Sequence, residues 1–170
     1  MGIESHPSRF AALVAHFHHY QQPLVLTGAG CSTASGIPDY RDKNGHWKHR
    51  QPVQFNDFIN SESVRKRYWA RSMHGWPGFH DATPGNAHIA LANLEADGWI
   101  RHIITQNIDG LHQVAGSRNV IDLHGKLHTL SCIDCGYQTD RNSYQEILLA
   151  WNPQFICASP EAAPDGDSRS

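Results

Sequence analysis

Three short polar stretches contain the residue types that bind a nucleotide and move protons. Residues 27–41 read Thr-Gly-Ala-Gly-Cys-Ser-Thr-Ala-Ser-Gly-Ile-Pro-Asp-Tyr-Arg, residues 105–110 read Thr-Gln-Asn-Ile-Asp-Gly, and a third stretch is His124-Gly125. Glycines let backbone N–H groups approach a pyrophosphate closely. A histidine near its ordinary pKa of about 6.5 accepts a proton at neutral pH. These residue types predict a nucleotide-binding site that also contains a histidine.

Each stretch follows a short apolar segment that predicts a strand, the first of them buried. These segments are residues 24–27, 99–105 and 119–123. Helical spacing of apolar residues separates them, which is typical of βαβ units and a mostly parallel sheet. Ligands bind at the carboxyl ends of such strands. The fold class is therefore α/β, and the three polar stretches are expected to gather at one edge of the sheet.

Caps and glycines predict where the helices begin and end. A first amphipathic helix covers residues 8–21, and another covers 61–73 before His-Gly-Trp-Pro-Gly at 74–78 breaks the chain. A third helix begins after the cap Thr83-Pro84 and ends at Gly98, with Ala87, Ala90, Leu91 and Leu94 on its apolar face. The last covers 142–151, with Asn142 and Gln145 as its capping pair. The polar residues 42–56 predict a mobile loop.

Composition excludes several classes of protein. The 170 residues carry a net charge of −2, which argues against a nucleic-acid partner. No apolar run approaches the roughly 20 residues that span a membrane, and residues 1–10 do not resemble a signal peptide. The expected location is the cytoplasm, where the spacing Cys132-x-x-Cys135 favours metal or redox chemistry over a structural disulfide.

The glycine stretch does not match the fingerprint of dinucleotide-dependent dehydrogenases. Gly28-x-Gly30 is followed by Thr33 where the fingerprint has a third glycine. No second strand ending in an acidic residue follows about 20 residues later. The chain instead continues into a second turn at residues 35–39 that would fold over the ligand. Hydride transfer is therefore disfavoured, whereas nucleotide binding is not.

The ordered motifs resemble the sirtuins, which are NAD-dependent protein-lysine deacylases, some with ADP-ribosyl transfer. Gly-Ala-Gly-x-Ser-x-x-Ser-Gly-Ile-Pro-Asp-Tyr-Arg, Thr-Gln-Asn-Ile-Asp-Gly-Leu-His, Leu-His-Gly and Cys-x-x-Cys occur in that order between residues 24 and 136. Residues 67–71, 75–77 and 163–167 are most similar to the class II branch. The resemblance implies a Rossmann-like large domain with a parallel sheet, and a small domain that holds structural zinc.

The resemblance also implies how the chain is divided. Residues 1–170 would be the N-terminal part of a sirtuin catalytic domain. Residues 1–125 would form the Rossmann-like portion, with a loop and helical insertion at 42–80. Residues 126–157 would be part of the zinc-binding module, and 158–170 are expected to be disordered because Pro, Asp, Gly and Ser dominate there.

Site residues follow from the same resemblance. The catalytic residues would be His124 as general base, with Asn107 and Asp109. The residues that would bind NAD are Gly28, Ala29, Gly30, Ser32, Gly36, Ile37, Pro38, Asp39, Tyr40, Arg41, Gln106, Asn107, Ile108 and Asp109. Ala29, Gly30 and Ser32 would hold the pyrophosphate and Arg41 would reach the phosphates. Gln106 would touch the nicotinamide ribose, and Tyr40 would cover its reactive carbon. Ile37, Asn107 and Asp109 would line the nicotinamide pocket.

Other candidate residues have equally ordinary interpretations. Tyr68 and Arg71 resemble a Tyr-x-x-Arg that holds acidic acyl groups in some sirtuins, but an i,i+3 pair on a solvated helix face fits as well. Cys31 is expected to pack in the core, with an acidified thiol at a helix N-terminus as the alternative. His112 and His128 are expected to be ordinary hydrogen-bonded histidines.

Cys132 and Cys135 supply two of the four ligands that structural zinc requires. The second cysteine pair of the sirtuins does not occur in this chain. A Cys₃His site that adds His128 and Cys157 is the alternative.

The sequence also lacks the sirtuin Phe-Gly-Glu region and the later Gly-Thr/Ser-Ser loop. The expected protein is therefore a truncated sirtuin whose sheet leaves apolar surface uncovered. Its function would be deacylation of acyl-lysine proteins or peptides, with release of nicotinamide and O-acyl-ADP-ribose. The alternatives are an inactive NAD-binding fragment, a protein ADP-ribosyltransferase and a zinc-ribbon interaction domain. The oligomeric state is not predicted.

Overall fold

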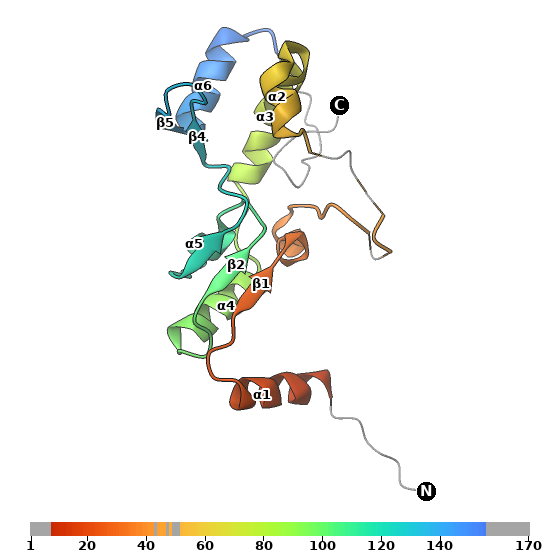
Figure 1. The fold of residues 1–170 in the computed structure, drawn as a ribbon, viewed down its shortest axis with the longest axis vertical. Helices are drawn as coiled ribbons and strands as arrows, with labels where there is room; N and C mark the ends of the chain where they lie inside the picture. Colours follow the sequence, from red (N-terminus) through yellow and green to blue (C-terminus); the bar gives the residue numbers. More distant parts are fainter. Residues whose placement is uncertain (1–7, 43, 47, 49–51, 156–170) are drawn as a thin grey trace, which may run out of the picture.

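The computed structural model describes residues 8–42, 44–46, 48 and 52–155 of the chain. A parallel sheet lies in the middle of the elongated molecule, with α1 at one end and the α3, α6 and hairpin region at the other (Figure 1). The helices and strands are α1 Arg9–His19, β1 Val25–Thr27, α2 Phe55–Asn60, α3 Glu62–His80, α4 Asn86–Ala96, β2 Ile103–Thr105, α5 Leu111–Val114, β3 Val120–Asp122, β4 Thr129–Ser131, β5 Gln138–Asp140 and α6 Arg141–Trp151. Two 3₁₀ turns, η1 Ala29–Cys31 and η2 Thr33–Ser35, follow β1.

The three-stranded sheet has the order β1-β2-β3, and both strand pairs are parallel. Thr27 lies in register with Thr105, and Thr105 lies in register with Asp122. The three strands therefore end at one edge, and the three polar stretches leave the sheet side by side. The α/β class with a parallel sheet, predicted from the sequence, is confirmed.

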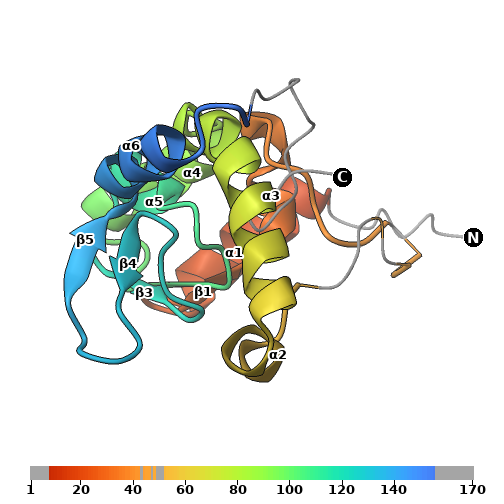
Figure 2. The same cartoon turned by 90° about the horizontal axis from the view of Figure 1, so that it is seen from above.

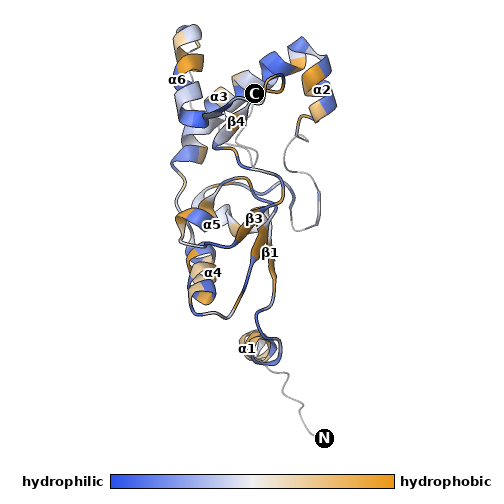
Figure 3. Ribbon diagram, turned by 60° about the vertical axis from the view of Figure 1, so that its left-hand side comes forward, coloured by the Kyte–Doolittle hydropathy of each residue, from blue (hydrophilic) through white to orange (hydrophobic). Residues whose placement is uncertain are grey.

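Helices α4 and α5 lie on the same side of the sheet (Figure 3). Ile103 of the central strand is fully buried, whereas Leu26 is 61% exposed and Ile121 is 50% exposed. Side chains alternate between the two faces of a strand, so the helices cover one face and apolar side chains remain exposed on the other. The prediction that residues 24–27 form a buried strand is therefore wrong in its burial, although the strand itself is present.

Helix α1 agrees with the amphipathic helix predicted at residues 8–21. The Ser8 hydroxyl accepts a hydrogen bond from the Ala11 amide and so caps the helix. Its apolar side chains are exposed: Phe10 is 75% exposed and Leu13 is 53% exposed. Among the described residues, no helix combines the length and the apolar character that crossing a membrane requires.

The glycine stretch does not open an α-helix. Cys31 N donates to Gly28 O, and Ser35 N donates to Ser32 O, which are the i→i+3 bonds of short 3₁₀ turns. Gly36 then adopts a left-handed conformation with φ of 86°, a backbone region that glycine enters without steric cost. The glycine stretch therefore provides no α-helix dipole.

Helix α3 continues through the predicted break at 74–78. Pro77 has no N–H, so the Met73 carbonyl loses its helical partner. The Gln145 side-chain amide of α6 donates to that carbonyl at 2.8 Å, and the Arg141 guanidinium donates to the neighbouring Ser72 carbonyl at 3.1 Å. The prediction that α3 ends at Met73 is wrong because α6, from a distant part of the sequence, satisfies the carbonyl that the proline leaves open.

Two predicted helix caps are also wrong. Helix α4 begins at Asn86 after Gly85 rather than after Thr83, because the His88 Nδ1 atom accepts a hydrogen bond from the Gly85 amide at 3.1 Å. Helix α6 is capped by Asp140, whose carboxylate accepts from the backbone amides of the first helical turn. The end of α4 before Gly98 is confirmed.

The apolar face predicted for α4 is displaced. His88 and Ala92 are the buried residues of this helix, Leu91 and Leu94 are half-buried, and Ala87 and Ala90 are exposed.

A small apolar core connects the sheet to the α3 region. Ile37, Trp76, Phe79 and Leu111 are all nearly fully buried and pack together. The Trp76 Nε1 atom donates to Asn142 Oδ1 at 2.8 Å, which links this core to α6.

Figure 2 shows the β4–β5 hairpin beside α6. Helix α2 begins at Phe55, inside the predicted loop 42–56, part of which lies outside the described residues, as do Cys157 and 158–170.

We expect Gln145→Leu to lower the free energy of unfolding by about 1–3 kcal/mol, because the buried Met73 carbonyl would lose its partner. Urea unfolding at pH 7 measures the change. Gln138→Leu, at an exposed position of β5, is the matched control and should change stability by less than about 0.5 kcal/mol. Equal effects of the two substitutions would contradict the role assigned to Gln145.

Candidate functional site

A cavity of about 680 Å³ opens at the carboxyl edge of the sheet. All three polar stretches contribute to it. Its lining residues are Ala29, Gly30, Ser32, Ile37, Asp39, Tyr40, Arg41, Pro52, Gln106, Asn107, Ile108, Asp109 and His124. The volume suits a ligand of cofactor size. The parallel register of the strands therefore brings together residues that are almost 100 positions apart in the sequence.

A buried hydrogen-bond network forms the floor of this cavity. The Ser32 hydroxyl donates to Asp109 Oδ2 at 2.6 Å, and Asn107 Nδ2 donates to Ser32 Oγ at 2.9 Å. Asp109 Oδ1 also accepts from the Leu111 amide at 2.9 Å, and Asn107 Nδ2 contacts the Gly28 carbonyl at 3.2 Å. Ser32 is fully buried, and Asp109 is only 5% exposed. The network holds the glycine stretch against the loop that follows β2.

The Ser32 side chain is occupied within the protein. A hydroxyl has one hydrogen to donate, and here that hydrogen lies on Asp109. The resemblance implied that Ser32 holds the pyrophosphate, but in this geometry its hydroxyl has no donor left for a phosphate. Ala29 and Gly30 line the same cavity beside Ser32.

His124 has a defined tautomer. Its Nδ1 atom lies 2.9 Å from the Gln106 carbonyl oxygen, which can only accept a hydrogen bond. Nδ1 therefore carries the hydrogen, and Nε2 of the neutral ring keeps a lone pair that can take up a proton. Since His124 also lines the cavity, this geometry suits a general base.

Charged residues surround the other end of the cavity. Lys48 Nζ forms an ion pair with Asp39 Oδ1, and Arg41 Nη1 donates to the Gly45 carbonyl at 2.9 Å. Both Asp39 and Arg41 line the cavity. The hydrogen bond to Gly45 therefore holds the Arg41 guanidinium at the cavity wall.

Five predicted residues are absent from the cavity lining. Gly28, Gly36 and Pro38 belong to the same stretch but lie outside the lining. Tyr68 and Arg71 are half-buried on α3, where the Tyr68 ring packs edge-on against Phe58 at 5.2 Å. Pro52 does line the cavity, and nothing in the sequence around it indicates a ligand.

The sequence did not predict that His88 contacts Ser32. His88 is fully buried on α4, and its Nε2 atom lies 3.3 Å from Ser32 Oγ. Its position within the helical pattern was the available signal, since a histidine there faces the sheet among apolar residues.

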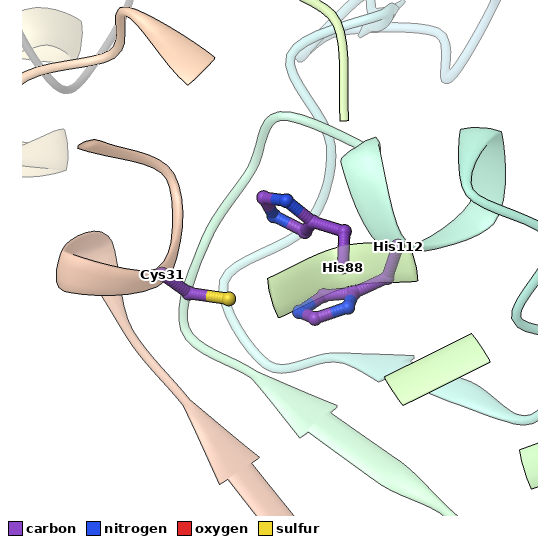
Figure 4. Close-up of side chains that lie close together, drawn as sticks. All are labelled: Cys31, His88 and His112. Atoms are coloured by element: carbon purple, nitrogen blue, oxygen red, sulfur yellow. The ribbon is translucent and has the colours of Figure 1, made fainter. Parts of the chain in front are cut away.

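The side chains of Cys31 in η1, His88 in α4 and His112 in α5 lie close together (Figure 4). Their potential ligand atoms come within 4.8 Å of one another. Three of the four ring nitrogens are already engaged, however, because His88 bonds Gly85 and Ser32, and His112 Nε2 bonds Thr27 Oγ1 at 2.9 Å. Only the buried His112 Nδ1 has no hydrogen-bond partner among the described residues. The cluster is therefore better described as a hydrogen-bonded support of the cavity floor than as a metal site.

The alternative of an acidified thiol at Cys31 is contradicted. Burial and the nearby Asp109 carboxylate raise the pKa of the Cys31 thiol. The turns η1 and η2 also provide no α-helix N-terminus to lower it.

Cys132 and Cys135 lie in the exposed turn between β4 and β5. Hydrogen bonds from the Cys135 and Asp134 amides lower the pKa of the Cys132 thiol, so the turn favours a thiolate. Among the described residues, no further His, Cys, Asp or Glu completes a three-ligand group with this pair. His128 instead packs against the Trp76 ring at 5.4 Å.

The sequence model of the Sir2 family matches residues 28–160, which contain almost all of the three polar stretches and the cysteine turn. The chain belongs to the Sir2 family. This membership agrees with the sirtuin resemblance of the sequence.

Curated relatives and solved Sir2 structures are similar to this chain in sequence and in fold. A protein of Bradyrhizobium diazoefficiens, "NAD-dependent protein deacetylase 2", is 52% identical over 149 residues, covering 88% of this chain and 55% of the relative. A Bordetella bronchiseptica "NAD-dependent protein deacetylase" is 47% identical, covering 98% and 61%. The structure "Sir2-p53 peptide-NAD+" aligns with a TM-score of 0.71 at 30% identity, covering 92% of this chain and 63% of that one. The chain spans a little over half the length of these curated relatives.

Stability should fall as the pH decreases below about 6.5. Burial lowers the pKa of His88 and of His112, so the unfolded chain takes up protons there that the folded chain does not. The free energy of unfolding should then decrease by up to about 1.4 kcal/mol per pH unit for each histidine. Urea unfolding between pH 7 and pH 5 measures this slope.

His112→Gln should flatten the slope, whereas His19→Gln, at an exposed position of α1, should leave it unchanged. A slope that persists in full in His112→Gln would contradict this assignment.

Proposed function

We propose that this chain carries the NAD-binding and proton-accepting part of a protein-lysine deacylase. The observation that carries the proposal is His124, whose tautomer leaves Nε2 as an acceptor at a cavity also lined by Asn107 and Asp109. Supporting it, the relatives in Bradyrhizobium and Bordetella are named NAD-dependent protein deacetylases. One solved relative is described as bound to an acetylated peptide.

NAD, when bound, would supply a ribose carbon that can lose nicotinamide and accept the acyl-lysine oxygen. His124 Nε2 accepts the proton from a ribose hydroxyl, while the Gln106 carbonyl keeps the ring oriented and stabilises the imidazolium through Nδ1–H. The buried Asp109 carboxylate lines the same cavity and would stabilise positive charge that develops there.

The glycine stretch and Arg41 would bind the phosphates. Ala29 and Gly30 line the cavity with little side chain, so backbone N–H groups can approach an anion. Gln106 would contact the ribose, and Ile37, Ile108 and Tyr40 would enclose the nicotinamide end. Asp39 would support the site through its ion pair with Lys48. Tyr68 and Arg71 remain candidates for an acyl-group contact.

Cys132 and Cys135 would hold one edge of a structural zinc site. The amides directed at Cys132 favour the thiolate that zinc binds. The metal would fix the β4–β5 turn, and it takes no part in the reaction proposed here.

His124→Ala should reduce nicotinamide release from NAD and an acetyl-lysine peptide at least about 100-fold, because the general base is removed. Its affinity for NAD should change less than about threefold. Chromatography of the released nicotinamide measures the rate, and the exposed His19→Ala is the matched control.

Each other outcome selects a different function. NAD binding without any release by the unaltered chain would indicate an inactive NAD-binding protein. ADP-ribose attached to protein would indicate a transferase. Full activity of His124→Ala would contradict the role of His124.

A further inference from the structure

His88 lies directly behind the cavity floor without lining the cavity. It is 0% exposed, and its two ring nitrogens contact different parts of the chain. Nδ1 lies 3.1 Å from the Gly85 amide nitrogen at the start of α4, and Nε2 lies 3.3 Å from Ser32 Oγ. One residue therefore joins the cap of a helix to the polar network of the site.

The direction of both hydrogen bonds is fixed by their partners. A backbone N–H only donates, so His88 Nδ1 must accept from Gly85 and the hydrogen of the neutral ring sits on Nε2. Burial lowers the pKa of His88, which keeps the ring neutral at pH 7. Nε2–H therefore donates to Ser32 Oγ.

The hydrogen bond from His88 Nε2 restricts the Ser32 hydroxyl to a single orientation. Its oxygen accepts from His88 Nε2 and from Asn107 Nδ2, which occupies both lone pairs. Its one hydrogen then points to Asp109 Oδ2 at 2.6 Å. The Asp109 carboxylate is held by this bond on one oxygen and by the Leu111 amide on the other.

We propose that His88 is a positioning residue of the NAD site: it holds the Ser32 hydroxyl onto Asp109 and so orients the carboxylate for the ligand. The expected effect of His88 on NAD binding rests on the proposed function. The hydrogen bonds that His88 makes do not depend on it. His112 supports the arrangement, since its ring lies 4.8 Å from that of His88 at an interplanar angle of 64° (Figure 4).

Two substitutions separate positioning from simple packing. Asn at position 88 places an amide near Nδ1 and can preserve the Gly85 bond, but it does not reach Ser32. Gln at position 88 is long enough to donate to Ser32 Oγ. We expect His88→Asn to weaken NAD binding about tenfold, the value of one hydrogen bond, and His88→Gln to stay within about threefold of the unaltered chain.

Calorimetric titration with NAD measures both affinities, and thermal unfolding measures the loss of stability. A packing role predicts that affinity follows stability in both variants, without recovery in His88→Gln. That result would overturn the proposal.

Nuclear magnetic resonance of the ring nitrogens tests the hydrogen-bond chain without any ligand. His88 should be neutral at pH 7 with its hydrogen on Nε2, and this N–H signal should shift in Ser32→Ala. Thr27→Val is the matched control, because it should shift the His112 signal instead.

A hydrogen on Nδ1 of His88, or no response to Ser32→Ala, would overturn the inference even if NAD binds. The expected signals in a chain that fails to bind NAD would uphold the hydrogen-bond chain and contradict only the proposed function.

Discussion

The hydrogen bond between the Ser32 hydroxyl and the buried Asp109 carboxylate is the constraint on which the site depends. A carboxylate that is only 5% exposed must have its oxygens paired, or its burial would cost several kcal/mol. Ser32 satisfies one oxygen and the Leu111 amide satisfies the other. Because Ser32 follows β1 and Asp109 follows β2, satisfying this charge forces the two loops together. These two loops form most of the cavity lining, and His124, after β3, completes it together with Pro52.

The strands, helices α4 and α5, and the core around Trp76 hold this pair of loops in place. The parallel register of β1, β2 and β3 sets the height at which the loops leave the sheet. His88 of α4 contacts Ser32, and α5 begins two residues after Asp109 with the buried Leu111. Trp76 packs against Leu111 and Ile37 and is itself bonded to Asn142 of α6. The distant α6 thus supports a residue of the cavity wall through one aromatic side chain.

Local patterns in the sequence predicted the three strands of the parallel sheet and most helices, but not the β4–β5 hairpin. The sirtuin resemblance indicated most of the residues that line the cavity. Those features depend on residue type and short spacing, as at Gly30, Asn107 and His124. What the sequence did not reveal depends on partners far along the chain. Helix α3 continues through Pro77 because the side-chain amide of Gln145, 72 positions beyond Met73, donates the hydrogen bond that the missing N–H of Pro77 cannot. His88 looked like an ordinary helical residue because its contact with Ser32 spans 56 positions.

Backbone amide resonances during titration of the unaltered chain with NAD test the central claim most directly. The account predicts that the shifts concentrate in residues 28–41, 105–110 and 124–125, at the edge of the sheet where the strands end. Amides of α1 should not move. Shifts centred on the β4–β5 hairpin or α1, or no shifts at millimolar NAD, would contradict an NAD site built on the bond between Ser32 and Asp109.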